Sequence, residues 1–169
     1  QLHVPLIVRL PYGDMAGERD PHWAGLLDIA PTIASRAGVE DEDIPQGMQQ
    51  GLNLFTATGR GNRMLFAEED HEGNRLRSVR YGVDDDQWKF IFANNNNPRG
   101  LPERELFDIE NDREEQNNLA ESNSTELERA EERLETATQA AAINAVTRDP
   151  SAEMTPEVRA QLCALGYLT

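Results

Sequence analysis

With 169 residues, the chain is long enough for one domain or for part of a larger protein. Only 38% of its residues are hydrophobic and the mean hydropathy is −0.67, while 31 acidic against 16 basic residues give a formal net charge of −15. This charge repels the phosphates of nucleic acids and of anionic lipids, so we expect neither as a partner, and it is typical both of proteins from saline habitats and of ordinary soluble acidic proteins. A single cysteine, Cys163, excludes an internal disulfide and a zinc site built from cysteines, and no apolar run approaches the ~20 residues that a membrane span needs.

The first apolar run, in "HVPLIVRLP", predicts a strand from Val4 to Val8. The run does not alternate between apolar and polar residues, which is typical of a strand covered on both faces in a parallel sheet. Because the sequence opens almost directly on such a strand, at Gln1 and without a methionine, we expect the chain to be a fragment of a longer protein. A loop with two glycines and one proline, "YGDMAGERDPHW", follows.

The stretch "GLLDIAPTIASRAG" predicts a helix. Asp28 is a candidate N-cap, Pro31 falls in the first turn, where its missing N–H is tolerated, and Gly38 is a suitable stop. The residues expected to share the buried face are Ile29, Ile33 and Ala37. Most of residues 39–62, which are rich in acidic, amide and glycine residues, is expected to be loop.

Four short runs rich in β-branched and aromatic residues come next, separated by turn-forming residues. The expected strands are residues 63–68, 75–82, 87–93 and 103–109. Their short connections predict an antiparallel meander of four strands. In the third run Trp88, Phe90 and Phe92 occupy alternate positions, so one face of this strand is strongly aromatic and needs a cover.

A helix over residues 124–145 is expected to supply that cover. Its apolar residues recur every three or four positions, at Leu127, Ala130, Leu134, Ala137 and Ala141. The candidate caps are Asn123, Ser124 and Thr125, with Glu126 or Glu128 reaching back. Asn123-Ser124-Thr125 also matches a glycosylation sequon, but we prefer the helix cap.

The stretch "ELFDIENDREEQNNLA" (105–120) is expected to lead from the sheet to that helix. Phe107 and Ile109 end the fourth strand, and Leu106 faces the other way. The polar residues that follow form a solvated crossover, whose far end Leu119 fixes to the core. After the helix, the sequence predicts a linker and a short helix from about Pro156, with a stop at Gly166.

The acidic and histidine residues have simpler structural interpretations than a metal or catalytic site. "EEDHE" (68–72) offers Glu68, Asp70 and His71 as ligands, yet it lacks the spacing of an EF-hand loop and is better interpreted as a solvated hairpin turn. "DDD" (84–86) is likewise interpreted as a turn. The isolated histidines are His3 and His22, for which we expect structural or surface roles. No flanking base marks Cys163 as a nucleophile.

Several of these stretches, in this order, resemble the C-terminal third of the sulfatases, in the alkaline-phosphatase-like superfamily. The usual forms in that family are a "VPLI" strand, a "DxxPTxxxxAG" helix, a "KLI"-type strand and the closing "ELYDLxxDPxExxNLA", with "LxxLGY" at the end of many bacterial members. The chain has "HVPLIVRLP", "LLDIAPTIASRAG", "GLNLF", "WKFIF", "ELFDIENDREEQNNLA" and "LCALGYL". The matches to the closing pattern are Glu105, Leu106, Asp108, Asp112, Glu115, Asn118, Leu119 and Ala120, while Phe107 replaces a tyrosine and Arg113 a proline.

The resemblance implies an α/β fold class for the parent protein, with an α+β arrangement in this chain. The end of a large alkaline-phosphatase-like α/β domain would be followed by a small four-stranded antiparallel sheet packed on a C-terminal helix. The expected domains are residues 1–62 (C-terminal part of the large α/β domain), 63–145 (sheet-plus-helix subdomain) and 146–169 (linker and short helix).

The resemblance also implies hydrolysis of sulfate esters by a formylglycine, made from the Cys or Ser of a C/S-x-P-x-R motif, and a Ca²⁺ ion held by aspartates and an asparagine. Neither motif occurs here: Cys163 is followed by "ALGY", and "EEDHE" does not match the family's "DHG" metal motif. We therefore assign no catalytic or metal residue and leave the substrate-binding residues unknown. The formylglycine and calcium site is expected in an N-terminal catalytic part of the same polypeptide, so the chain alone is expected to be inactive. A periplasmic or secreted location is favoured.

Two alternatives stay open. The first is another hydrolase or transferase of the alkaline-phosphatase superfamily, such as a phosphodiesterase, a phosphonate hydrolase or a phosphoglycerol transferase, many of which use threonine as nucleophile. The second is a non-catalytic acidic binding module that acts alone. The sequence upstream of Gln1 would separate these alternatives from a sulfatase.

Overall fold

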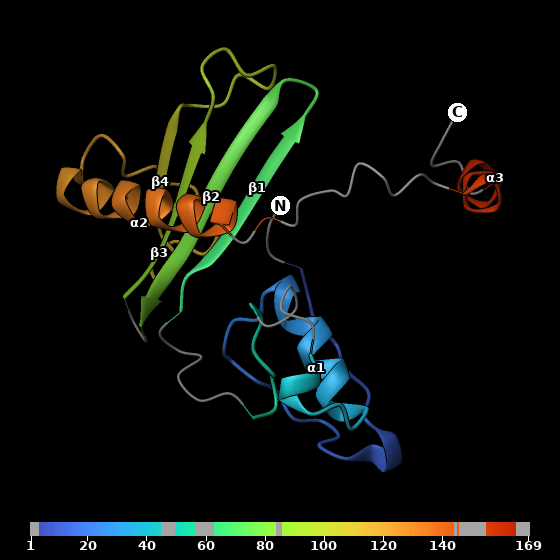
Figure 1. The fold of residues 1–169 in the computed structure, drawn as a ribbon. Helices are drawn as coiled ribbons and strands as arrows, with labels where there is room; N and C mark the ends of the chain where they lie inside the picture. The colour runs from blue at the N-terminus through green and yellow to red at the C-terminus, as the bar shows by residue number, and fades with distance from the viewer. Residues whose placement is uncertain are drawn as a thin grey trace.

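The computed structural model describes residues 4–44, 50–56, 63–83, 86–143, 145 and 155–164 (Figure 1). In these ranges the chain forms an α+β fold, as the sequence predicts. The strands are β1 (Leu65–His71), β2 (Asn74–Val83), β3 (Asp86–Ala93) and β4 (Arg104–Asp108). The helices are α1 (Ile29–Arg36), α2 (Ser124–Ile143) and α3 (Pro156–Ala164), with 3-10 turns η1 (Pro11–Gly13), η2 (Leu26–Asp28) and η3 (Asp41–Asp43). None of the described helices is long and apolar enough to cross a bilayer.

The sheet is an antiparallel meander in the order β1-β2-β3-β4, which confirms the predicted topology. A two-residue turn, Glu72 and Gly73, joins β1 to β2. Both residues have positive φ angles, 52° and 81°, as the type I′ turns of tight hairpins require. Because side chains alternate between the two faces of a strand, this register gives each face of the sheet its own set of residues.

Helix α2 lies across one face of the sheet (Figure 1). The central row of that face is Phe66, Val79, Phe90 and Leu106, one residue from each strand. The helix contributes its predicted stripe, with Ala130, Leu134 and Ala137 buried. Phe90 and Leu106 are fully buried, and burial of one such side chain contributes ~1.5–3 kcal/mol. The aromatic face of β3 therefore has the cover that the sequence predicts.

Asn123 caps the start of α2. Its Oδ1 accepts the N–H of Glu126 at 3.2 Å, which confirms the preference for a cap at this position. Glu126 does not reach back to the helix start as expected: its carboxylate accepts the Tyr81 hydroxyl at 2.9 Å and pairs with Arg129 at 3.2 Å. The reason lies in the core, because the buried Tyr81 hydroxyl needs an acceptor there.

The apolar run Val4–Val8 does not form the predicted strand. Its side chains are exposed, Ile7 to 88% and Val4 to 62%. A strand needs neighbouring strands that satisfy its N–H and C=O groups, and no described strand pairs with this run. The apolar pattern thus indicates a segment suited to burial, while the described part of the chain supplies nothing that buries it.

Helix α1 confirms the predicted helix but buries a different face. Pro31 and Thr32 are buried, whereas Ile33 and Ala37, expected on the buried face, are exposed. Gly38, with a φ angle of 82°, follows the end of the helix as predicted. Spacing alone fails here because polar contacts, rather than apolar ones, decide which side of this short helix faces inward.

Candidate functional site

Asp28, the expected N-cap of α1, is instead the centre of a buried polar cluster. Its carboxylate Oδ2 lies 2.6 Å from Nη1 of Arg63, and Oδ1 lies 3.0 Å from Nη2. The backbone N–H groups of Gly25 and Leu52 donate to the same carboxylate at 2.6 and 2.9 Å. Burial raises the pKa of Asp28, but the Arg63 guanidinium and the two N–H groups more than offset burial and hold the pKa below its ordinary value.

Thr32 extends this cluster into the loop that follows α1. Its Oγ1 donates to the Asp28 carbonyl at 2.6 Å and accepts the N–H of Leu54 at 3.0 Å. In the same loop, Gly51 lies so close to η2 that a Cβ atom there would stand 1.9 Å from the Leu27 carbonyl oxygen. The cluster leaves no acid, base or nucleophile open to a substrate. We interpret it as a structural cluster that holds η2, the loop after α1 and Arg63 together.

The segment between β4 and α2 is held by carboxylates that accept its own backbone N–H groups. Asp112 accepts the N–H of Gln116 at 3.0 Å and that of Asn117 at 2.8 Å. These bonds hold the pKa of Asp112 below its ordinary value. Asp108 accepts the N–H of Asn111 at 3.1 Å. Asp108 and Asp112 therefore shape this crossover.

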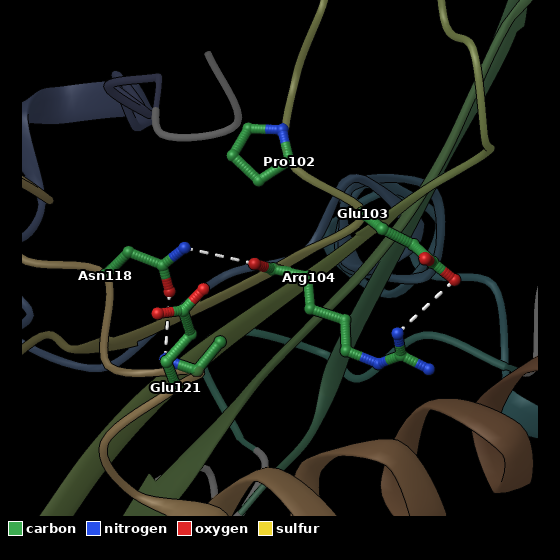
Figure 2. Close-up of a pocket in the computed structure, with 6 residues that line it drawn as sticks. Pro102, Glu103, Arg104, Asn118 and Glu121 are labelled. Atoms are coloured by element: carbon green, nitrogen blue, oxygen red, sulfur yellow. Dashed lines mark hydrogen bonds and ion pairs between the residues drawn. The ribbon is translucent and has the colours of Figure 1, made fainter.

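Asn118 binds the open edge of β4 with both ends of its side-chain amide. Its Oδ1 accepts the N–H groups of Leu106 and Ala120, each at 3.0 Å. Its Nδ2 donates to the Arg104 carbonyl at 3.0 Å (Figure 2). The N–H of Leu119 donates to the Leu106 carbonyl at 2.8 Å. The crossover thus covers the sheet edge, where unpaired backbone groups would invite pairing with another chain.

A cavity of about 430 Å³ lies beside this contact, as Figure 2 shows. Its lining residues are Pro102, Glu103, Arg104, Asn118, Ala120 and Glu121. Arg104 forms ion pairs with Glu103 at 3.3 Å and with Glu131 at 2.6 Å. Because two acids already balance this guanidinium, which is the one cation among the lining residues, the cavity is poorly suited to an anionic ligand.

A second cavity, of about 590 Å³, lies between the sheet and the first half of α2. Charges of both signs line it, among them Glu126, Arg129 and Arg133. Burial and the neighbouring Glu126 raise the pKa of Tyr81 well above its ordinary value, and the Arg133 guanidinium lies 4.6 Å from the centre of the Tyr81 ring. Tyr81 therefore stays protonated and bound to Glu126, which leaves it unsuited to acid–base chemistry.

The face of the sheet opposite α2, here called the outer face, is only partly covered. Its residues are Leu65, Ala67, Ser78, Arg80, Lys89, Ile91, Glu105 and Phe107. Residues before β1 cover one end: the Arg80 guanidinium stacks 4.3 Å from the ring of Trp23, and Gly25 lies against Leu65. Near the centre, Ile91 and Glu105 are half-buried.

Two acids and one base meet on the outer face. Lys89 Nζ binds both carboxylate oxygens of Glu115, at 2.7 and 2.5 Å, and only 11% of the Lys89 side chain is exposed. Glu105 accepts no hydrogen bond from any described residue. Burial raises the pKa of Glu105, the Lys89 charge opposes this shift, and the Glu115 charge adds to it. Together with the buried Nε of Arg80, which has no hydrogen-bond partner in the described structure, this half-buried carboxylate marks the outer face as a candidate binding surface.

The structure places the residues that the sequence offers as metal ligands along one strand. Glu68, Asp70 and His71 lie within β1, and Glu72 and Gly73 form the hairpin turn, so "EEDHE" is a turn only at its end. Among the described residues, no group of three or more His, Cys, Asp or Glu side chains could hold a metal ion.

The remaining candidates lie apart from one another. His22 is exposed and its Nδ1 lies 2.7 Å from Oδ1 of Asp20. Cys163 is a free thiol on the surface of α3. Asp86, taken as part of a turn, is the first residue of β3. The residues His3, Asp84, Asp85 and Gly166 lie outside the described ranges.

Comparison with known proteins gives one family. The family model described as "N-sulphoglucosamine sulphohydrolase, C-terminal" matches residues 1–140. The match covers most of the chain, including α1, the whole sheet and most of α2, and it ends before α3. No curated protein and no solved structure matches the chain.

Proposed function

Because this chain belongs to the N-sulphoglucosamine sulphohydrolase C-terminal family, and is thus the C-terminal region of a sulfatase, we propose that it is the non-catalytic part of an enzyme whose formylglycine and Ca²⁺ lie upstream. The parent enzyme would hydrolyse a sulfate ester. When bound there, the calcium ion would polarise the oxygens of the sulfate group. The role of this chain would be to pack against the catalytic part and help shape its substrate cleft.

The single observation that carries the proposal is the family match over residues 1–140. The side chains are consistent with a supporting role. The described residues contain no cluster able to hold calcium, so no step of the reaction is assigned to them. Asp108 and Asp112 of the family-like motif accept backbone N–H groups, and Asp28 is engaged by Arg63.

The exposed apolar residues suggest how the two parts are joined. Ile7 and Val4 belong to an extended segment, and Leu26 and Ile33 are exposed to 79% and 63% on η2 and α1. Exposed apolar side chains gathered in one part of a protein commonly mark an interaction surface. We assign this surface to the catalytic part, to whose sheet residues 4–8 would add a strand.

The proposal is tested with the complete gene product and with residues 1–169 alone. We expect the complete protein, supplied with calcium and matured to formylglycine, to hydrolyse an aryl sulfate. A substitution of the Cys or Ser in its C/S-x-P-x-R motif should abolish turnover. Residues 1–169 alone should give no turnover above buffer. Activity of residues 1–169 that is lost on substitution of one of their own side chains would contradict the proposal, and so would a threonine nucleophile upstream.

A further inference from the structure

One carboxylate on the outer face, that of Glu105, has no positively charged partner among the described residues. Glu105 lies on the edge strand β4 beside Ile91 of β3, is half-buried, and accepts no hydrogen bond from any described residue. Lys89, a base on the same face, is already bound to both oxygens of Glu115. A carboxylate that is partly withdrawn from water without a partner destabilises the fold that holds it.

One buried donor on the same face has no hydrogen-bond acceptor in the described part of the chain. The Nε atom of Arg80 is buried and has no hydrogen-bond partner in the described structure. The guanidinium makes one hydrogen bond, from Nη2 to the Gln87 side chain at 3.3 Å, and stacks on Trp23. Native proteins satisfy nearly all buried polar groups, so the unpaired Nε of Arg80 indicates that something further covers this face, where the half-buried Glu105 also lacks a partner.

We propose that the outer face is the surface on which the N-terminal catalytic part of the same polypeptide docks, with a basic side chain of that part paired with Glu105. This inference rests on the proposed function, because it takes the catalytic part as the occupant. The half-buried Ile91 would supply an apolar contact beside the ion pair, and a carbonyl or carboxylate of the catalytic part would accept from Arg80 Nε.

Two observations favour the catalytic part over a second copy of the chain. Residues before β1 already cover one end of the outer face, at Trp23 and Gly25, and the sequence predicts that these residues belong to the large domain. A docked catalytic part would therefore continue a contact that the chain itself begins. A second copy would bring another molecule of net charge −15 against the unpaired Glu105, and like charges oppose that association.

The test is hydroxyl-radical footprinting of the complete gene product, read by mass spectrometry at Ile91. The exposed Ile143 serves as the internal reference. We expect Ile91 to be modified much more slowly than Ile143 in the unaltered protein, and several-fold faster after Glu105→Lys. Glu105→Gln keeps the shape of the side chain and removes only the charge, so it should give a smaller rise even if Glu105→Lys fails to fold.

The matched control is Glu128→Lys, the same charge reversal at an exposed position on α2, which should leave the Ile91 rate unchanged. Equal modification of Ile91 and Ile143 in the unaltered protein would overturn the docking surface. Protection of Ile91 that does not respond to either Glu105 variant would overturn the ion pair. Protection that disappears on dilution, together with a dimer in solution, would overturn the catalytic part as the occupant.

Two independent measurements test the docking surface and the proposed function. Aryl sulfate turnover by the same preparation tests the function and does not depend on the Ile91 rate. Turnover with an unprotected Ile91 would refute the docking surface alone. A protected, Glu105-dependent Ile91 in a complete protein that has no sulfatase activity would refute the function alone.

Discussion

Oδ2 of Asp28 and Nη1 of Arg63 lie 2.6 Å apart, although 35 positions separate the two residues in the sequence. The Asp28 side chain is fully buried and that of Arg63 is 16% exposed, so water does not reach the Asp28 carboxylate to replace Arg63. The ion pair joins the end of η2 to the residues that lead into β1. It therefore couples the α1 region to the sheet, two parts of the chain that the sequence predicts to belong to different domains.

We expect Arg63→Met to lower the free energy of unfolding by ~3–5 kcal/mol, because it leaves the Asp28 carboxylate buried without its counter-charge. Urea denaturation followed by fluorescence measures this change. Arg99→Met is the matched control, since Arg99 and its partner Glu69 are both substantially exposed, and it should leave the free energy of unfolding nearly unchanged. Equal losses in the two variants would contradict a special role for the buried pair.

Lowering the pH should weaken the ion pair between Asp28 and Arg63. The pKa of Asp28 is lower in the folded protein than in the unfolded chain, where an aspartate titrates near ~3.9. The stability that this difference contributes is complete above the unfolded pKa and is lost as the pH falls through the folded pKa. Asp28→Asn should therefore be less stable than the unaltered protein at neutral pH, with a difference that shrinks below about pH 4. Urea midpoints across this range measure it, and a difference independent of pH would count against the assignment.

Phe90 should matter more to the sheet than Trp88, although both side chains point toward α2. Phe90 is fully buried, whereas Trp88 is half-buried and its Nε1 donates to Asp86 at an exposed position. We expect Phe90→Ala to cost ~3–5 kcal/mol and Trp88→Ala distinctly less. Denaturant titrations of both variants give the comparison. A larger loss for Trp88→Ala would mean that the core centre lies nearer the turn between β2 and β3.

Asn118→Ala should loosen the edge of β4. The substitution removes the acceptor of the Leu106 and Ala120 N–H groups and the donor to the Arg104 carbonyl, so we expect a loss of ~1–3 kcal/mol. Hydrogen exchange should become faster at the Leu106 amide. Glu114→Ala, at an exposed position of the same segment, is the control and should stay within ~0.5 kcal/mol. An unchanged Leu106 amide in Asn118→Ala would refute the edge-covering role.

The sequence by itself determines the four-stranded sheet, the helix that covers it and the family. The strands and α2 follow from patterns with periods of two and of three to four residues, which depend only on neighbours along the chain. The turn at Glu72 and Gly73 and the cap at Asn123 are equally local. The resemblance to sulfatases, stated from short motifs in their order, is confirmed by the family match over residues 1–140.

Tertiary structure alone decides how the polar residues are used. Nothing near Asp28 in the sequence indicates that Arg63 neutralises it, because that contact depends on how two distant segments pack. For the same reason Ile33 turns outward while Thr32 turns inward to bind the loop after α1. The apolar pattern of residues 4–8 indicates burial but cannot identify what covers them. Local patterns record which surfaces suit burial, whereas the partner of each surface is fixed by contacts between residues far apart in the chain.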